Sequence, residues 1–97
     1  MANDDPVTVD PADRGAVRRN LERFADPDSV SDRDDGALVA QFRGVTHVTV
    51  TADGRIETGM ALHEFAGAPD RLVFDHGAGE LRVEDADGDT SYTFRRP

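Results

Sequence analysis

The chain has 97 residues, which suits a single small domain with one hydrophobic core. Twenty acidic residues against eleven basic ones give a formal net charge of −9, which argues against nucleic acids and anionic membranes as partners, because phosphate contacts need cations. The chain has no cysteine, which excludes disulfides, thiolate nucleophiles and cysteine zinc sites.

The first nine residues, MANDDPVTV, predict a flexible tail before a single domain over residues 10–97. They lack the basic and apolar regions of a secretory signal, and no apolar run approaches the roughly 18 residues that a membrane-spanning helix needs. We therefore expect a cytoplasmic protein with no membrane contact.

The segment DPADRGAVRRNLERFADP, residues 10–27, predicts one amphipathic helix. Asp10 is a suitable N-cap, Pro11 suits the first helical position, and Pro27 ends the run. The apolar side chains expected to share its buried stripe are Val17, Leu21 and Phe24.

Four arginines crowd this helix, namely Arg14, Arg18, Arg19 and Arg23. Ion pairing on the helix surface, for example with Glu22, is the simplest interpretation. The same basic stripe could meet the acids of a second copy, or grip the phosphates of a nucleic acid, which is the least expected partner because such binding weakens in salt. These arginines are therefore candidate interaction residues.

Residues 26–36, DPDSVSDRDDG, contain five aspartates and predict an acidic linker loop between helix and sheet. A calcium loop of the EF-hand type needs oxygen ligands at positions 1, 3 and 5, glycine at 6 and glutamate at 12. Counted from Asp32, glycine falls at position 5 and Arg43 at position 12. Counted from Asp85, Thr90 and Arg96 stand at positions 6 and 12. We therefore expect only unspecific contact with salt cations and no metal site.

After the linker the apolar period changes from helical to two, which predicts strands. The lengths of the turns between the strands predict the register, because paired residues must carry their apolar side chains on the same face. We expect turns of two residues at 87–88, four residues at 76–79, and three residues at 52–54 with Gly54 in the left-handed conformation. The predicted strands are 37–43, 45–51, 55–58, 71–75, 80–84 and 90–95. The predicted pairs are Val83 with Tyr92, Leu81 with Phe94, Leu72 with Val83, Phe74 with Leu81, and Val50 with Ile56.

The segment GMALHEFAGAP, residues 59–69, does not alternate cleanly and predicts a short helical turn or an irregular crossover between two sheet halves. Long connections often hold functional residues. Nearby, His63 with Glu64 and Asp75 with His76 form adjacent pairs that could bind a metal or small ligand if the fold joins them, although structural roles are expected more often. They are candidate binding residues. No nucleophile or phosphate-binding motif is present, so we predict no catalytic residues and no cofactor.

These elements predict an α+β domain in which one N-terminal helix packs on a five- to six-stranded antiparallel meander sheet. The opposite sheet face carries Val39, Val45 and Val73 among polar residues. The expected core is Val17, Leu21, Phe24, Leu38, Phe42, Val48, Val50, Ile56, Leu72, Phe74, Leu81, Val83, Tyr92 and Phe94.

The eleven basic residues are all arginine, lysine is absent, and aspartate is abundant. Together with the segments VDPADRGAVRRNLERFADPDSV, GMALHEF, DRLVFDH and YTFRRP, this composition resembles a family of small acidic haloarchaeal proteins without known activity. The resemblance implies a cytosol of concentrated salt and brings no cofactor or partner. Molar salt shortens the Debye length to about 3 Å, so excess acid costs little, and salt also strengthens apolar burial, so a light core suffices.

The function expected from these features is interaction. We predict a small non-enzymatic accessory protein that pairs with itself or with another protein through the second sheet face or an edge strand. The alternative is a small-ligand or metal-binding domain, conceivably an enzyme, built around the candidate binding residues.

Overall fold

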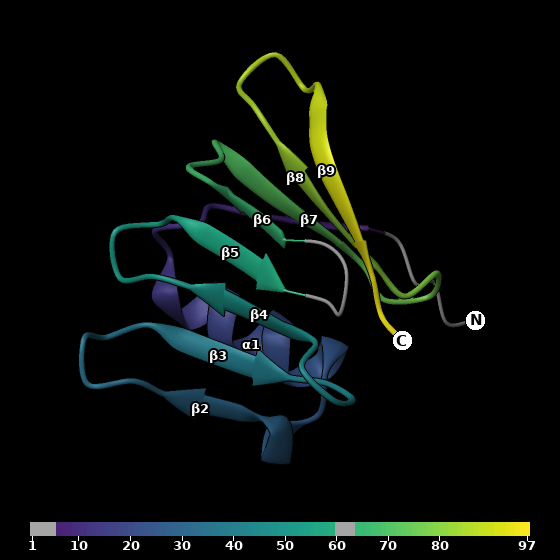
Figure 1. The fold of residues 1–97 in the computed structure, drawn as a ribbon. Helices are drawn as coiled ribbons and strands as arrows, with labels where there is room; N and C mark the ends of the chain where they lie inside the picture. The colour runs from purple at the N-terminus through teal and green to yellow at the C-terminus, as the bar shows by residue number, and fades with distance from the viewer. Residues whose placement is uncertain (1–5, 60–63) are drawn as a thin grey trace.

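The computed structural model describes residues 6–59 and 64–97 and shows strands arranged in two sheets with one α-helix (Figure 1). Within these residues no helix is long and apolar enough to cross a membrane. The elements are β1 Val7–Val9, α1 Arg14–Phe24, the 3-10 helix η1 Pro27–Ser29, β2 Val30–Asp32, β3 Leu38–Gln41, β4 His47–Val50, β5 Ile56–Gly59, β6 Glu64–Gly67, β7 Arg71–Asp75, β8 Glu80–Glu84 and β9 Thr90–Arg95.

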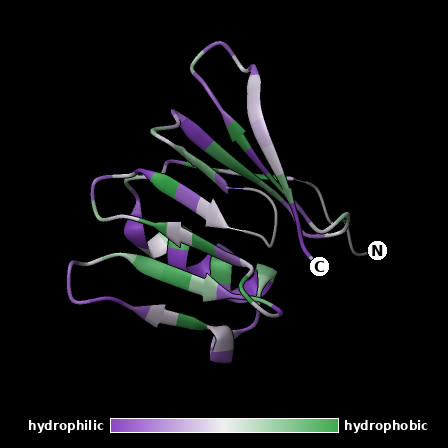
Figure 2. Ribbon diagram, viewed as in Figure 1, coloured by the Kyte–Doolittle hydropathy of each residue, from purple (hydrophilic) through white to green (hydrophobic). Residues whose placement is uncertain are grey.

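The two sheets are antiparallel throughout, with strand orders β2-β3-β4-β5-β6 and β1-β7-β8-β9. The α+β class is confirmed, and so is a helix on a five-stranded meander, because α1 contacts β2 and β3. The remaining strands form a second sheet, which the prediction of one continuous sheet had merged with the first. In Figure 2 the hydrophobic green segments lie mainly in the strands of both sheets.

The expectation of a flexible tail is wrong for residues 7–9, which form β1. This strand pairs with β7, and Val9 is buried opposite Leu72. Three residues are too few for a convincing alternation, and the partner strand lies more than sixty positions away, so the sequence shows no local signal. The first five residues lie outside the described part of the chain.

The acidic linker of residues 26–36 is also more ordered than expected. Its first half forms η1, with Pro27 at the start, and β2, which pairs with β3 so that Val30 faces Ala40. The charged residues around β2 obscure the alternation that would predict a strand. A short charged strand is a common way to protect a sheet edge.

The helix begins at a different cap from the one expected. The carboxylate of Asp13 accepts a hydrogen bond from the Ala16 amide at 3.2 Å, whereas Asp10 accepts from Ala12 at 2.9 Å in the turn before the helix. Pro11 therefore precedes the helix instead of starting it. The predicted buried stripe of α1 is confirmed, since Val17, Leu21 and Phe24 are all buried.

Phe24, at the end of α1, is the centre of the core. Its ring meets those of Phe42, Phe74 and Phe94 edge-on at centroid distances of 6.0, 5.8 and 6.2 Å, so it joins the helix to both sheets. Most of the predicted core is buried, while Phe42 and Tyr92 are half-buried against it. Arg96 donates from Nη1 to the Phe24 carbonyl at 2.9 Å and lies over its ring, which closes the helix end.

All five predicted cross-strand pairs are confirmed. The three-residue turn at 52–54 is also confirmed, with Gly54 at φ +86° and Thr51 paired to Arg55. The turn at 87–88 is wrong in length: Asp85 pairs with Asp89 around three residues, and Gly88 has φ +86°. A bulge next to Glu84 absorbs the extra residue, which is why the register of β8 and β9 survives.

Residues 64–67 of the segment 59–69 form β6, so the predictions of a short helical turn and of an irregular crossover are both wrong for these residues. Phe65 points to the inner side and stacks on Tyr92 of the other sheet at 4.6 Å, so its burial is completed by a distant strand. Residues 60–63 lie outside the described residues.

Candidate functional site

The fold places the candidate binding residues in different sheets. Glu64 begins β6 of the five-stranded sheet and is exposed, whereas Asp75 ends β7 of the four-stranded sheet. His63 lies outside the described residues. The described members of the two adjacent pairs therefore belong to separate sheets.

His76 and Asp75 support the fold. The imidazole of His76 is buried, stacks on Phe74 at 5.7 Å, and has Nε2 3.0 Å from the Oδ1 of Asn20 in α1. The Asp75 carboxylate accepts a hydrogen bond from the Ala78 amide at 3.0 Å and so orders the turn between β7 and β8. Each side chain thus has a packing or turn-forming role.

The helix arginines are drawn towards the acidic segment of their own chain. Arg18 pairs with Asp32 of β2 and with Glu22 at 3.8 Å. Arg14 donates to the Gly36 carbonyl and lies 4.0 Å from Asp32. Intramolecular pairing, the simplest interpretation, thus accounts for these two arginines.

The outer face of the four-stranded sheet is covered by its own ion pairs. Glu84 lies 3.6 Å from both Arg71 and Arg82, and Glu80 lies 3.8 Å from Arg82 and 3.4 Å from Arg95. Val73 pairs with Arg82 on one side and Thr8 on the other, and it is only 5% exposed. Val73 was expected on a partly uncovered face, but its neighbours bury it.

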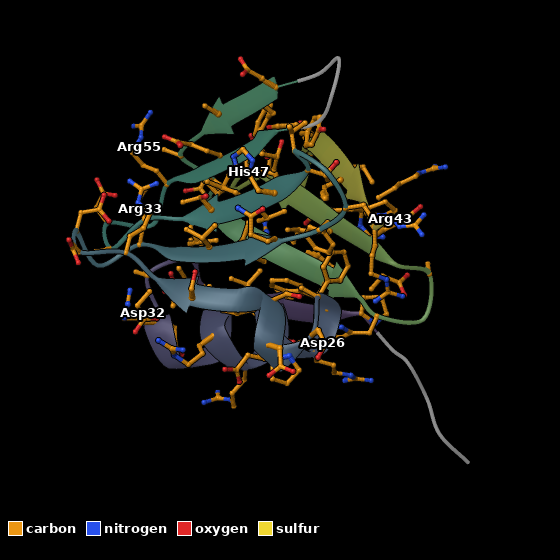
Figure 3. All side chains as sticks on the ribbon, turned by 60° about the horizontal axis from the view of Figure 1, so that its bottom comes forward. Asp26, Asp32, Arg33, Arg43, His47 and Arg55 are labelled. Atoms are coloured by element: carbon orange, nitrogen blue, oxygen red, sulfur yellow. The ribbon has the colours of Figure 1, made fainter. Side chains whose placement is uncertain are left out.

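The outer face of the five-stranded sheet, which Figure 3 shows, is different, since the charged side chains that its strands direct outward, Glu57 and Glu64, lie on β5 and β6. Arg33, Arg43 and Arg55 stand around its rim, and His47 lies on it. We call its uncharged part the neutral face. It consists of Ser31, Val39, Gln41 and the buried Thr49, which alternate with inward-facing residues of β2, β3 and β4, whereas Glu57 of β5 separates Thr49 from Ala66 of β6.

A cavity of about 250 Å³ opens beside the neutral face. Its lining residues are His47, Glu57, Thr58, Glu64, Phe65 and Ala66. His47 Nδ1 lies 3.2 Å from the Val45 carbonyl oxygen, and the ring lies so close to Gly59 that a Cβ there would be 2.4 Å from Cε1. Glu64 is among the candidate binding residues predicted from the sequence, whereas His47 and Glu57 are not, because alternation alone marks them as ordinary outward-facing residues.

Two open clefts of about 560 and 330 Å³ flank the C-terminal end of α1 and share Ala25 and Arg96. The guanidinium of Arg96 is held there by the Phe24 carbonyl and ring. The main role of Arg96 is therefore to bind the carbonyl and the ring at the C-terminal end of α1.

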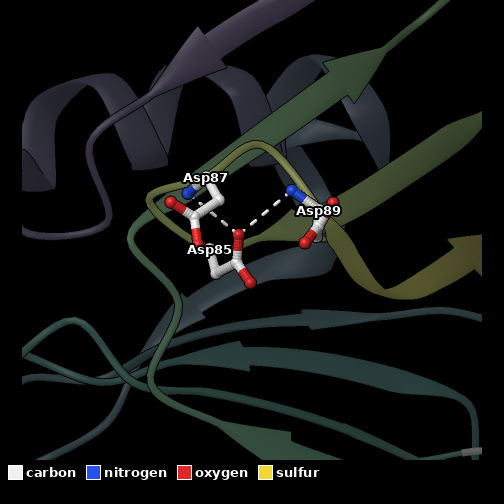
Figure 4. Close-up of side chains that lie close together, drawn as sticks. All are labelled: Asp85, Asp87 and Asp89. Carbon is white, nitrogen blue, oxygen red and sulfur yellow. Dashed lines mark hydrogen bonds between the residues drawn. The ribbon is translucent and has the colours of Figure 1, made fainter.

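The three aspartates of the β8–β9 turn lie close together (Figure 4). One carboxylate oxygen from each of Asp85, Asp87 and Asp89 lies within 4.8 Å of the others. Asp85 Oδ1 already accepts hydrogen bonds from the amides of Asp87 and Asp89, both at 3.0 Å. The cluster is thus explained as a turn in which one carboxylate orders the backbone.

We expect the carboxyl group of Asp35 to titrate below its ordinary range. The Arg33 guanidinium, which donates a hydrogen bond at 2.6 Å, and the Ala37 amide lower the pKa of Asp35. Because the folded-state pKa lies below the unfolded value, the contact stabilises the fold above about pH 4 and is lost as the pH falls through the folded-state pKa. In an NMR titration, Arg33→Gln should raise the Asp35 midpoint.

Asp53 provides the internal control for this titration. Its pKa is lowered mainly by the Thr51 hydroxyl, which donates to it. Arg33→Gln should leave the Asp53 midpoint where it was, while Thr51→Val should raise it. An Asp35 midpoint that ignores Arg33→Gln would contradict the ion-pair explanation.

No family model, curated protein or solved structure matches this chain. The assignment of sites therefore depends on the geometry of the chain itself.

Proposed function

We propose that this protein is a small non-enzymatic interaction protein that pairs with a second copy of itself through the neutral face. One observation carries the proposal: the outer faces of the two sheets differ in charge. The four-stranded sheet covers its face with an ion-pair ladder, whereas β3 and β4 of the five-stranded sheet direct Val39, Gln41 and Thr49 to their outer side. Depletion of charge is typical of the centre of a protein interface.

The net charge favours this face for contact between copies. Two chains that each carry −9 repel least where neither presents carboxylates. The rim arginines Arg33, Arg43 and Arg55 and the acids Glu57 and Glu64 border the same face, so a two-fold contact can place opposite charges together. A partner of another sequence would need its own matching pattern, whereas a second copy has it already.

The size of the face sets the strength of the association. The whole outer face of the five-stranded sheet, with strands of about four residues, covers roughly 300 Å² at the usual strand spacing and rise, and the neutral face is a part of it. This is below the roughly 800 Å² per partner of a stable dimer. The proposed association is therefore transient, and it shifts with protein concentration.

We expect Val39→Arg to abolish self-association. The substitution places a cation at the half-buried centre of the neutral face, and two like charges would meet across a two-fold contact. Sedimentation velocity in molar KCl, from micromolar to millimolar protein, should show a concentration-dependent dimer for the original chain and a monomer throughout for the variant.

Thr8→Arg is the matched control. Thr8 is exposed on the outer face of the four-stranded sheet, beside Val73, so the variant adds the same charge to the other surface. It should dimerise like the original chain. A strict monomer at every concentration, or a dimer broken by Thr8→Arg alone, would refute the proposal.

We also propose that the protein works in a cytoplasm of concentrated salt, as proteins of the acidic haloarchaeal type do. Support comes from the excess of acids and the absence of lysine. Exposed carboxylates such as Asp28, Asp34 and Asp87 stand at turns and edges, where they hydrate the surface.

The nucleic-acid alternative loses support from the helix arginines. Arg14 and Arg18 are directed to Asp32 and Glu22, so their charge is largely compensated within the chain. Ligand binding by the two adjacent pairs also loses support, because Asp75 orders the turn after β7 through the Ala78 amide and His76 has Asn20 of α1 as its partner.

A further inference from the structure

We propose that the cavity beside Gly59 binds a divalent transition-metal ion through His47 Nε2 and the carboxylates of Glu57 and Glu64. This inference goes beyond the proposed self-association and does not depend on it. All three side chains line one cavity of about 250 Å³. They come from three adjacent strands, β4, β5 and β6.

Strand register places the three side chains on one face of the sheet, with their ligand atoms farther apart than the 4.8 Å that spans the Asp85 cluster. His47 pairs with Gly59, and Gly59 pairs with Glu64, so the histidine and the glutamate flank a residue without a side chain. Adjacent strands lie about 4.8 Å apart, which puts the two backbones roughly 10 Å from one another. An imidazole and a glutamate each extend about half that distance, so their ends can meet above the glycine.

Gly59 is the residue that leaves room for this meeting. A Cβ at this position would lie 2.4 Å from His47 Cε1 and 2.9 Å from Nδ1, distances that atoms do not tolerate. The imidazole therefore lies across the glycine, towards β6. Glu57 stands two residues earlier on β5 and hence on the same face of the sheet.

The hydrogen bond of His47 leaves its other nitrogen available. The Val45 carbonyl oxygen, 3.2 Å from Nδ1, can only accept, so Nδ1 carries the proton in the neutral ring. The lone pair is then on Nε2. Metal-binding histidines are commonly oriented in this way, by a backbone carbonyl on the second nitrogen.

Both glutamates can turn towards the imidazole, and the Arg33 guanidinium lies near enough to Glu57 to interact with its charge. Glu57 and Glu64 are exposed, and each has three rotatable side-chain bonds with which to bring a carboxylate to the imidazole. One nitrogen and two carboxylates suit Zn²⁺ and its neighbours better than Ca²⁺ or Mg²⁺, which prefer oxygen alone. The Asp85 cluster is different, since it offers carboxylate oxygens and no nitrogen.

The test is a titration of the full chain with Zn²⁺ in its folding salt, by calorimetry and by ¹H–¹⁵N NMR. We expect one ion per chain, with amide shifts confined to residues 45–49, 57–59 and 64–67. His47→Gln should weaken binding at least tenfold, and Glu64→Gln should weaken it to a smaller extent. Mg²⁺ should not compete. Circular dichroism will show that both variants, which alter half-buried or exposed side chains, remain folded.

Asp87→Asn is the matched control, because it removes one acid from the rival cluster and should leave the affinity for Zn²⁺ unchanged. Binding that survives His47→Gln, or that is lost on Asp87→Asn or His63→Gln instead, overturns the assignment. Sedimentation of the metal-free chain separates this result from the proposed function, since dimerisation through the neutral face needs no metal.

Discussion

Phe24→Ala should lower the free energy of unfolding by about 3 to 5 kcal/mol, the usual cost of emptying a buried phenylalanine site. The ring is 1% exposed and meets Phe42, Phe74 and Phe94, so its loss separates α1 from both sheets at once. Small domains are stable by only about 5 to 15 kcal/mol, so the variant will keep little reserve. Urea unfolding in molar KCl, followed by circular dichroism, measures the difference.

Phe65→Ala serves as the comparison for this substitution. Phe65 is half-buried and has one aromatic partner, Tyr92, at 4.6 Å. We expect a loss of about 1 to 2 kcal/mol, because the stacked pair adds only about 0.5 to 1.5 kcal/mol beyond burial. Equal losses from the two substitutions would show that the helix end is not the centre of the core.

Transfer from molar salt to about 10 mM salt should destabilise the fold by on the order of 3 kcal/mol. The estimate spreads nine charges over a compact sphere and over the larger unfolded chain, with a Debye length of about 3 Å in the first solution and about 30 Å in the second. The folded chain measures 35 × 29 × 29 Å, so in dilute salt every carboxylate interacts with every other. Urea unfolding at a series of KCl concentrations gives the slope.

The ion pairs act in the opposite direction, but they are weaker. Exposed pairs such as Arg82 with Glu84 contribute about 0.2 to 1 kcal/mol each and lose that contribution in salt. Stability should therefore still rise with KCl. The triple variant Asp34→Asn, Asp87→Asn and Asp89→Asn removes three exposed acids and should fold in less salt, whereas stability that falls as KCl rises would contradict the repulsion account.

The zinc and self-association proposals concern one surface, and their tests are informative together. His47 and Ala66 lie on neighbouring parts of the five-stranded sheet, so a metal ion could add a positive charge next to the neutral face. Measuring the concentration dependence of dimerisation with and without bound metal shows whether the two properties are coupled.

Several elements could be predicted from the sequence because their causes are local. The stripe of Val17, Leu21 and Phe24 requires only the helical period, and the pairing of Val83 with Tyr92 requires only alternation across a short turn. The predicted register of β8 and β9 is correct although the predicted turn is one residue too short, because a bulge at Glu84 keeps the apolar side chains on the same face. Burial of apolar side chains outweighs the choice of turn.

The elements that were missed depend on partners far along the chain. β1 exists because β7 offers an unpaired edge, and β6 because Phe65 finds Tyr92 in the other sheet. Neither segment has enough alternation of its own to indicate a strand. The division of nine strands into two sheets follows from such distant contacts as well.

The sequence by itself determined the acidic, lysine-free surface, the α+β class and the core side chains, since composition and period act residue by residue. Only the tertiary structure decided which polar residues meet. Strand pairing set His47 and Glu64 on either side of Gly59, and it moved His76 into the core beside Asn20. A binding site is made by side chains from separate strands, and their proximity follows from pairing energies that no local pattern records.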